Sequence, residues 1–313
     1  MPNLKILITD GLDESGLSIL RAQANADDRK DISAEDLLKA IPEYDGLIVR
    51  GRTKVTAAII EAASRLKAIG RAGVGVDNID LKAASGKGIA VVNAPISTSI
   101  AVAELTLGLM LAVAREIPRA DAGMKQGKWL KKELEGAELN GKTLGLIGFG
   151  NIGAEVGKRA SAFGMNVIAY RRMGSAEEMK RQGAELVALE ELYARSDFIS
   201  LHLPLSDQSR GMLGNDAFSK MKDGVRLVCA ARGGIVDEAA LVAALNSGKV
   251  AGAALDVFAA EPPGTTELTS HPRVIVTPHI GAQTAEAQSR ASADIASEVL
   301  SALQGKTLRW KVN

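Results

Sequence analysis

Three polar side chains follow short apolar runs in the second half of the chain. Arg232 lies in the segment AARGGIVD, Glu261 in LDVFAAEPP, and His279 at the end of VIVTPH. A guanidinium can bind a carboxylate through two hydrogen bonds, and an imidazole oriented by a carboxylate can take up and return a proton. Together these residue types can support hydride transfer at carbon 2 of a 2-hydroxy acid, with Arg232 on the substrate carboxylate and His279 as the acid and base.

A hydride needs an acceptor, and a glycine-rich segment can hold one. Residues 143–153 read TLGLIGFGNIG, in which an apolar strand leads into G-x-G-x-x-G and then a helix. In such a turn the first glycine allows the sharp bend, the second admits a pyrophosphate, and the third lets helix and strand pack closely. The segment therefore predicts a dinucleotide site. Glycines required only for tight packing are the alternative.

The next apolar run, residues 167–170, leads directly into Arg171 and Arg172. An NAD site favours an acidic residue at this point, where it accepts hydrogen bonds from the ribose. Guanidinium groups instead suit a 2′-phosphate. The sequence thus favours NADP(H), with NAD(H) as a possible cofactor; two solvated surface arginines are the alternative.

The chain has two further histidines besides His279. His202 follows an apolar run and is expected to line the cofactor cleft. His271 lies in a polar Ser-His-Pro loop and is expected at the surface. A structural role is the alternative for any lone histidine. The single cysteine and three scattered histidines have no metal-ligand spacing, so no metal is expected.

These residues must be positioned by alternating strands and helices. Strands are predicted at residues 5–9, 46–50, 66–71 and 89–93, and in a second series at 143–147, 167–170, 198–201, 226–229, 252–255 and 274–276. Helices are predicted at 14–24, 56–63, 101–115, 154–163 and 285–304, with a glycine turn at 148–153. Such alternation indicates parallel sheets, whose ligands bind at the carboxyl ends of the strands. Arg50, the turn at 73–75 and Asn93 lie at such ends.

Composition limits the class of protein. The 313 residues favour two domains, and a net charge of +1 without a basic block indicates neither nucleic-acid nor membrane-surface binding. The lone Cys229 fits a reducing compartment. Residues 1–10 lack a signal-peptide layout, and residues 100–117, with Glu104 and Arg115, are too short an apolar run for a membrane helix. We expect a cytoplasmic protein in which residues 101–115 form a helix buried on several sides.

At these residues the sequence resembles the D-isomer-specific 2-hydroxyacid dehydrogenases over nearly its whole length, and their phosphoglycerate dehydrogenase branch most closely. The matching segments are residues 71–80 (RAGVGVDNID), 148–153 (GFGNIG), 231–238 (ARGGIVDE), 255–258 (LDVF) with 261–263 (EPP), and 277–282 (TPHIGA). The resemblance implies an α/β fold of two doubly wound parallel-sheet domains. A Rossmann cofactor domain (residues 99–283) is inserted in a flavodoxin-like substrate domain (residues 1–98 and 284–313).

The resemblance also implies roles for single residues. Arg232, Glu261 and His279 form the implied catalytic triad, and Asp256 holds the nicotinamide carboxamide. The implied cofactor-binding set is Gly148, Phe149, Gly150, Asn151, Ile152, Gly153, Arg171, Arg172, His202, Leu203, Pro204, Ala230, Ala231, Asp256 and Gly281. Val74 and Gly75 meet the substrate carboxylate, and Arg50 and Arg71 lie near a substrate phosphate. A small 2-hydroxy or 2-oxo acid substrate, a homodimer and a role in serine biosynthesis are also implied.

The sequence departs from the family at three places. Arg171 replaces an acidic residue, which supports NADP(H) and casts doubt on the usual NAD-linked biosynthetic direction. Cys229 stands where many members have Asn. The chain stops at Asn313, so the C-terminal regulatory domains of some members, and serine feedback through them, are not expected. An NADPH-linked glyoxylate/hydroxypyruvate reductase is the alternative enzyme, and a dinucleotide-sensing, corepressor-like binding protein is the alternative class.

Overall fold

The computed structural model describes residues 4–313, and the chain divides into two compact units. One unit comprises Met1–Ser99 with Ala282–Asn313, and the other comprises Ile100–Gly281. The sequence-based boundaries lay at 98/99 and 283/284. The prediction that the N-terminus has no signal-peptide layout falls partly on residues 1–3, which lie outside the described residues.

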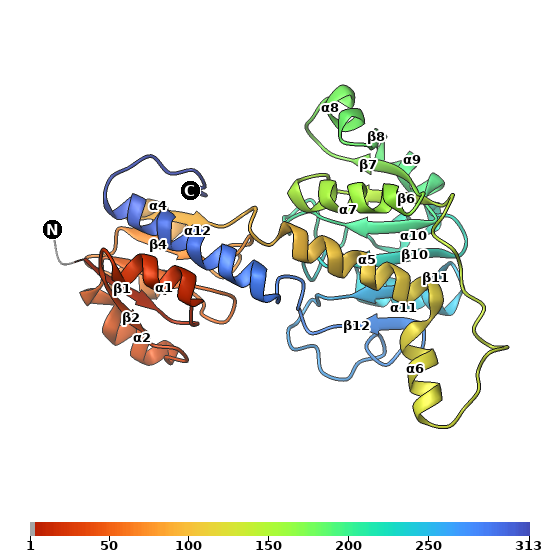
Figure 1. The fold of residues 1–313 in the computed structure, drawn as a ribbon, viewed down its shortest axis with the longest axis horizontal. Coiled ribbons are helices and arrows are strands. Elements are labelled where there is room, and N and C mark those ends of the chain that lie inside the picture. Colours follow the sequence, from red (N-terminus) through yellow and green to blue (C-terminus); the bar gives the residue numbers. More distant parts are fainter. Residues whose placement is uncertain (1–3) are drawn as a thin grey trace. The chain divides into compact units, whose positions relative to one another are not determined.

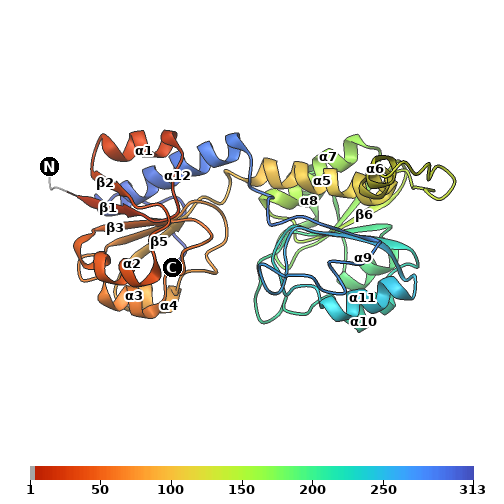
Figure 2. The same ribbon diagram turned by 90° about the horizontal axis from the view of Figure 1, so that it is seen from below.

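The first unit is built on a five-stranded parallel sheet (Figure 1). Its strands are β1 (Lys5–Ile8), β2 (Asn25–Asp28), β3 (Gly46–Val49), β4 (Ala68–Arg71) and β5 (Ala90–Asn93), in the order β2-β1-β3-β4-β5. Helices α1 (Glu14–Arg21) and α12 (Ala285–Leu303) cover one face, and α2 (Ala34–Ala40), α3 (Ala57–Ala62) and α4 (Leu81–Gly86) cover the other, as Figure 2 shows. A 3₁₀ helix, η1 (Ile41–Glu43), follows α2. The strand order is that of flavodoxin-like folds.

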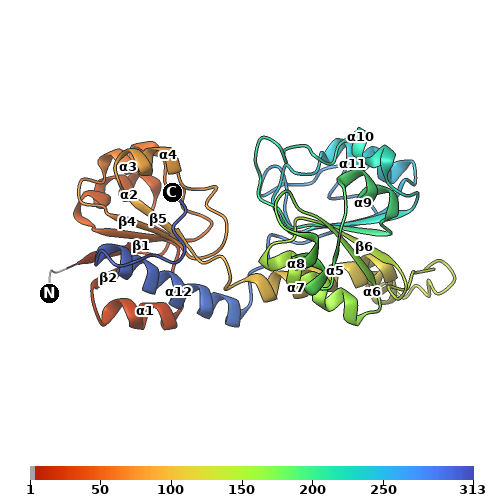
Figure 3. The ribbon, with the colours of Figure 1, turned by 90° about the horizontal axis from the view of Figure 1, so that it is seen from above.

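The second unit contains a seven-stranded parallel sheet in the order β12-β11-β10-β9-β6-β7-β8. Its strands are β6 (Thr143–Ile147), β7 (Asn166–Tyr170), β8 (Glu185–Leu186), β9 (Phe198–Leu201), β10 (Val225–Cys229), β11 (Val250–Leu255) and β12 (Val274–Val276). Helices α5 (Ser99–Arg115), α7 (Asn151–Ala162) and α8 (Ala176–Arg181) cover one face, and α9 (Leu189–Arg195), α10 (Asn215–Lys220) and α11 (Glu238–Asn246) cover the other (Figure 3). Helix α6 (Ile117–Lys125) follows α5.

The central strands form because both of their faces are buried. Every residue of β3 and of β9 is buried, and β6 exposes only part of Thr143. Strands covered on both sides are almost continuously apolar, which is why these runs could be located in the sequence. The connections place all carboxyl ends of one sheet on the same edge. The order of strands reverses between β6 and β9, where such sheets bind ligands.

The prediction of two parallel α/β sheets is confirmed, and the differences concern short or polar elements. Strand β2 has the sequence NADD, and it pairs only with β1 at the sheet edge, so it has no apolar pattern to detect. Helices α2, α4, α6 and α8–α11 and strand β8 were also not predicted. The glycine turn is shorter than predicted: α7 begins at Asn151 rather than at 154, because Gly150 already stands at the N-cap.

Candidate active site

The turn between β6 and α7 is built around three glycines that serve different purposes. Gly148 has φ +94°, and a Cβ atom there would lie 2.3 Å from the carbonyl oxygen of His202. A Cβ atom on Gly153 would lie 2.4 Å from the carbonyl oxygen of Gly148. A Cβ atom on Gly150 would meet no other atom within 4 Å. The backbone is therefore tightly packed at Gly148 and Gly153 and accessible at Gly150.

This turn fits a dinucleotide pyrophosphate. Helix α7 is 12 residues long, and its N-cap, Gly150, has no side chain to satisfy the first backbone amides. The backbone amides of a first helical turn and the positive end of the helix dipole favour an anion at this point. The residues predicted here, Gly148, Phe149, Gly150, Asn151, Ile152 and Gly153, thus form one turn and the first turn of α7, at the reversal of strand order.

Arg171 and Arg172 directly follow β7 and are both exposed. The Arg171 guanidinium lies 3.7 Å from the Glu178 carboxylate of α8, and both side chains are about two-fifths exposed. An ion pair this exposed contributes little to stability. The arginines are therefore accessible to a ligand at the edge where the adenosine half of a dinucleotide would lie.

His202 follows β9 directly beneath the glycine turn, and Leu203 and Pro204 come next. Its Nε2 atom lies 2.9 Å from the hydroxyl of Ser200. Its Nδ1 atom is buried, and no group of residues 4–313 forms a hydrogen bond with it. Burial lowers the pKa of His202 to about 3, so the imidazole is neutral at physiological pH. The ring therefore adds no positive charge beside the glycine turn.

His279 and Glu261 meet at the carboxyl ends of β11 and β12. The Glu261 Oε2 atom lies 2.8 Å from Nδ1 of His279, and Oε1 accepts a hydrogen bond from the Phe258 amide at 3.1 Å. The His279 side chain is about half exposed. The carboxylate is thus fixed by its own loop and in turn orients the imidazole. This leaves Nε2 as the ring nitrogen available to a ligand.

The turn around His279 is held by Asp256, which follows β11. The carboxylate of Asp256 is completely buried and accepts hydrogen bonds from the Thr277 hydroxyl and from the amides of Ile280 and Gly281. The predicted site residues Asp256, His279 and Gly281 therefore lie together, with Asp256 inside the turn.

The loop after β10 carries Ala230, Ala231 and Arg232 and packs tightly on the Glu261 loop. A Cβ atom on Gly233 would lie 1.7 Å from the Phe258 carbonyl oxygen. The Ala259 amide also donates to the Glu238 carboxylate at 2.7 Å. These contacts set the position of one loop against the other, so the loop bearing Arg232 is fixed relative to the loop bearing Glu261.

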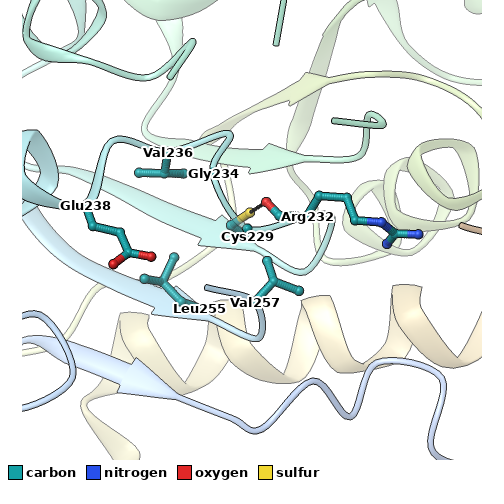
Figure 4. A pocket seen from close by; sticks show the side chains of 8 residues that line it. Cys229, Arg232, Gly234, Val236, Glu238, Leu255 and Val257 are labelled. Carbon is teal, nitrogen blue, oxygen red and sulfur yellow. Dashed lines mark hydrogen bonds between the residues drawn. The ribbon is translucent and has the colours of Figure 1, made fainter. Parts of the chain in front are cut away.

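Cys229 lies under this loop and contacts its backbone. Its thiol donates a weak hydrogen bond to the Arg232 carbonyl oxygen over 3.9 Å, and burial raises the pKa of the thiol to about 11. Figure 4 shows the thiol in a small pocket lined also by Leu255 and Val257, with the guanidinium of Arg232 pointing away from that pocket. A buried, protonated thiol is unreactive, so Cys229 acts here through packing.

The predicted substrate residues lie in the first unit at the carboxyl edge of its sheet. Arg50 follows β3 and Arg71 ends β4, the next strand. The guanidinium of Arg71 occupies the space over Gly73, where a Cβ atom would lie 1.5 Å from Nη1. The side-chain Nδ2 of Asn93 donates to the Val74 carbonyl oxygen at 2.7 Å, which fixes the loop that leads to Gly75.

Several residues that shape these loops were not identified from the sequence. The carboxylate of Asp10 is buried and accepts hydrogen bonds from the amides of Arg50 and Thr53 at 2.8 and 3.2 Å. Asn78 donates to the carbonyl oxygens of the same two residues. The available signal was an aspartate at the end of a parallel strand, which could have drawn attention to Asp10. Gly233 and Thr277 carried no comparable signal.

The structure and the comparisons define the class of protein together. Residues 107–281 match the model of the NAD-binding domain of D-isomer-specific 2-hydroxyacid dehydrogenases. The chain is 48% identical over 310 residues to D-3-phosphoglycerate dehydrogenase of Rattus norvegicus, which covers 99% of this chain and 58% of the relative. The chain thus spans a little over half the length of that relative.

Two solved structures show the same fold over whole chains. A glyoxylate reductase from Paecilomyes thermophila has a TM-score of 0.92 and 34% identity, covering 100% of this chain and 99% of its own. D-lactate dehydrogenase from Aquifex aeolicus, solved with NAD and lactic acid, has a TM-score of 0.85 and 30% identity, covering 96% of both chains. The protein is thus a nicotinamide-dinucleotide-binding α/β protein with a Rossmann domain. It belongs to the D-isomer-specific 2-hydroxyacid dehydrogenase family.

Among residues 4–313 no helix is long and apolar enough to cross a membrane. In the same part of the chain no group of three His, Cys, Asp or Glu side chains could hold a metal ion. The expectations of a cytoplasmic location and of no metal stay predictions.

We predict that Gly233→Ala lowers kcat/KM without preventing folding. The added methyl group would collide with the Phe258 peptide and displace the loop of Arg232 from that of Glu261. A displacement of about 1 Å in a catalytic group can cost on the order of 10²-fold in rate. Steady-state kinetics would measure this, with Gly86→Ala as the control, because a Cβ on Gly86 would meet nothing within 4 Å. Equal kcat/KM in both variants would contradict the proposed contact.

We also predict that His202 makes folding less favourable in acid. The unfolded chain binds a proton on this ring near the ordinary pKa of 6.5, whereas the folded chain does so only near 3. The free energy of unfolding should therefore fall as the pH falls between these values. Relative to His202→Gln, the native protein should lose about 2 kcal/mol between roughly pH 7.5 and pH 5. Parallel denaturation curves at each pH would reveal this, and a constant difference would refute the buried neutral ring.

Proposed function

We propose that the protein is an NAD(P)-dependent D-2-hydroxyacid dehydrogenase of the phosphoglycerate dehydrogenase type. It would transfer a hydride between the nicotinamide and carbon 2 of a small 2-hydroxy or 2-oxo acid. The observation that carries this proposal is the 2.8 Å contact between Glu261 and His279. It lies on the same sheet edge as a glycine turn that fits a dinucleotide.

Each catalytic side chain has a role that follows from its setting. When bound, the nicotinamide supplies the position that accepts or donates the hydride. His279, held at Nδ1 by Glu261, exchanges a proton with the C2 oxygen through Nε2, because only a correctly oriented base is effective. Arg232 binds the substrate carboxylate and polarises the C2 oxygen. Glu261 keeps the imidazole oriented through its hydrogen bond to Nδ1 while the proton is exchanged at Nε2.

The first unit would supply the substrate-binding domain and the second the cofactor-binding domain. Arg50 and Arg71 stand at the ends of neighbouring strands, a spacing at which two guanidinium groups can bind one phosphate. Backbone groups of Val74 and Gly75 would meet the substrate carboxylate. A phosphorylated 2-hydroxy acid, as in the dehydrogenase from Rattus norvegicus, is therefore the proposed substrate, and formation of a serine precursor the proposed role.

NADP(H) is the cofactor that the residues after β7 favour. Arg171 and Arg172 are exposed at the strand end where an NAD site would carry an acidic side chain. The other cofactor-binding residues proposed are those of the glycine turn, His202, Leu203, Pro204, Ala230, Ala231 and Gly281. For Asp256 the resemblance implies a contact with the nicotinamide carboxamide, to which a role in positioning His279 is the alternative. NAD(H) is the alternative, because the D-lactate dehydrogenase from Aquifex aeolicus was solved with NAD.

A second candidate function is that of an NADPH-linked glyoxylate/hydroxypyruvate reductase. The same two arginines support it, as does the 34% identity to a glyoxylate reductase across the whole chain. A purely dinucleotide-sensing, corepressor-like role is less well supported, because it would not require the oriented pair of Glu261 and His279.

The test is a matrix of three substrates and two cofactors. We expect phosphohydroxypyruvate with NADPH to give the highest kcat/KM, at least about tenfold above NADH, since one charge-assisted hydrogen bond is worth that factor. Faster turnover of glyoxylate or hydroxypyruvate would favour the reductase. Equal use of NADH would contradict the cofactor proposal, and no turnover of any pair would contradict the dehydrogenase proposal.

Two variants test separately the contact with the 2′-phosphate of NADPH and the contact with the substrate phosphate. Arg171→Ala should raise KM for NADPH and leave KM for NADH almost unchanged, because only NADPH has the 2′-phosphate. Arg50→Ala should raise KM for phosphohydroxypyruvate more than for hydroxypyruvate. If Arg50→Ala weakened both substrates equally, the phosphate contact would be wrong.

A homodimer is the proposed assembly, formed through the second unit. Large apolar side chains are exposed on α6 and the segment after it: Ile117 is 51%, Met124 57% and Trp129 76% exposed. Exposed apolar and aromatic side chains of this size are typical of protein–protein interfaces. Light scattering should give the mass of two chains for the native protein and of one chain for Trp129→Glu. A native mass of one chain would contradict the proposal.

A further inference from the structure

The turn that carries His279 has a backbone conformation that rarely occurs in residues with a side chain. The φ angle of His279 is +53°, and its amide donates to the Thr277 carbonyl oxygen at 3.0 Å. In this left-handed region a Cβ atom crowds the backbone, and the conformation persists only where the surroundings enforce it. Some other group must therefore hold the turn.

Asp256 is placed to do so from the neighbouring strand end. Its Oδ1 atom accepts hydrogen bonds from the Thr277 hydroxyl at 2.6 Å and the Ile280 amide at 2.8 Å. Its Oδ2 atom accepts one from the Gly281 amide at 2.8 Å. The three donors come from both sides of His279, so a single carboxylate closes the turn around that residue.

The burial of Asp256 makes these bonds strong and specific. The residue has no exposed surface, and its carboxylate accepts three hydrogen bonds from the turn. A buried charge without a cation is stable only if its lone pairs are filled by donors. A Cβ atom on Gly281 would lie only 3.1 Å from Oδ2, so the backbone approaches the carboxylate as closely as a glycine permits.

We propose that Asp256 is a positioning residue, which fixes the left-handed turn and thereby the direction of the His279 imidazole. Asp256 and Glu261 come from the same loop and act on the same turn: Asp256 holds its backbone, and Glu261 holds its ring. The inference rests on the proposed function in one respect, that the His279 imidazole is the acid and base.

The contact with the nicotinamide carboxamide that was inferred for Asp256 makes a different prediction. A cofactor contact should change the affinity for NADPH. In this structure each carboxylate oxygen accepts at least one hydrogen bond from the turn, and the residue has no exposed surface. The positioning role instead predicts slower chemistry with little change in cofactor binding.

The test uses the full-length chain with Asp256→Asn, which preserves the shape but replaces one acceptor by a donor. We expect kcat to fall on the order of 10²-fold, because the base is displaced. The dissociation constant for NADPH, measured by fluorescence, should change by less than about threefold, well under the factor of ten of one lost charge-assisted contact. The Ile280 and Gly281 amides should exchange with deuterium faster, a readout independent of any substrate.

Additional variants act as controls. Thr277→Val removes one of the three donors and should lower kcat by about tenfold, the worth of one hydrogen bond to a charged group. Thr277→Ser restores the hydroxyl and should recover most of that loss, which separates the hydrogen bond from overall folding. Asp80→Asn removes a carboxylate that caps α4 in the first unit, bonded to the Ala83 amide at 2.9 Å, and should leave kcat unchanged.

The outcomes are distinct. Unchanged exchange of the two amides in Asp256→Asn would overturn the proposal, as would faster exchange with an unchanged kcat. Weaker NADPH binding at an unchanged kcat would assign Asp256 to the cofactor instead. If the native protein turned over no 2-oxo acid, the proposed function would fail, while the exchange data would still report whether Asp256 holds the turn.

Discussion

The hydrogen bond between Glu261 and His279 is the interaction on which the rest of the site depends. It joins two loops whose bonded residues are 18 positions apart, and neither loop has regular secondary structure of its own. The bond exists because β11 and β12 are neighbours and end at the same edge. The Phe258 amide then fixes the carboxylate, and the buried carboxylate of Asp256 fixes the turn. An irregular segment can be positioned accurately only when its polar groups are satisfied in this way.

Close backbone packing also fixes the position of the third loop, which carries Arg232. Gly233 lies against the Phe258 peptide with no room for a side chain, so the loop of Arg232 takes its position from the loop of Glu261. Three neighbouring strands, β10, β11 and β12, thus deliver an arginine, a glutamate and a histidine to one edge. The parallel sheet explains why residues spread over nearly fifty positions can form one site.

The first unit contains a similar arrangement, in which a buried aspartate fixes a loop of the proposed substrate site. Asp10 at the end of β1 holds the amides of Arg50 and Thr53 at the end of β3. In both units a buried aspartate at a strand end satisfies the backbone of the adjacent loop, and the loop carries a side chain of the proposed site. Buried carboxylates with several amide donors are well suited to this task, because each bond is charge-assisted and directional.

Much of the fold followed from the sequence, because buried parallel strands leave long apolar runs. The runs at β3, β6 and β9 were located almost to the residue. Strand β2 was missed because an edge strand with the sequence NADD buries little apolar surface. Helix α7 begins earlier than predicted, because helix propensity does not locate a helix start at which the N-cap residue is a glycine. The candidate residues Arg232, Glu261 and His279 were likewise identified by type and by position at strand ends. What made them candidates was local: a turn after an apolar run.

The sequence by itself therefore determined the class of sheet, the glycine turn, and the side chains available at the strand ends, since these depend on nearest neighbours along the chain. The tertiary structure alone decided that Asp256 lies completely buried inside the His279 turn, that Gly233 must be a glycine because of the Phe258 peptide, and that the Nδ1 atom of His202 is enclosed. Each of these depends on contacts between segments far apart in the chain. Such contacts exist only once the strands have paired, because a hydrogen bond or a van der Waals contact is set by distances in space and not by spacing in sequence.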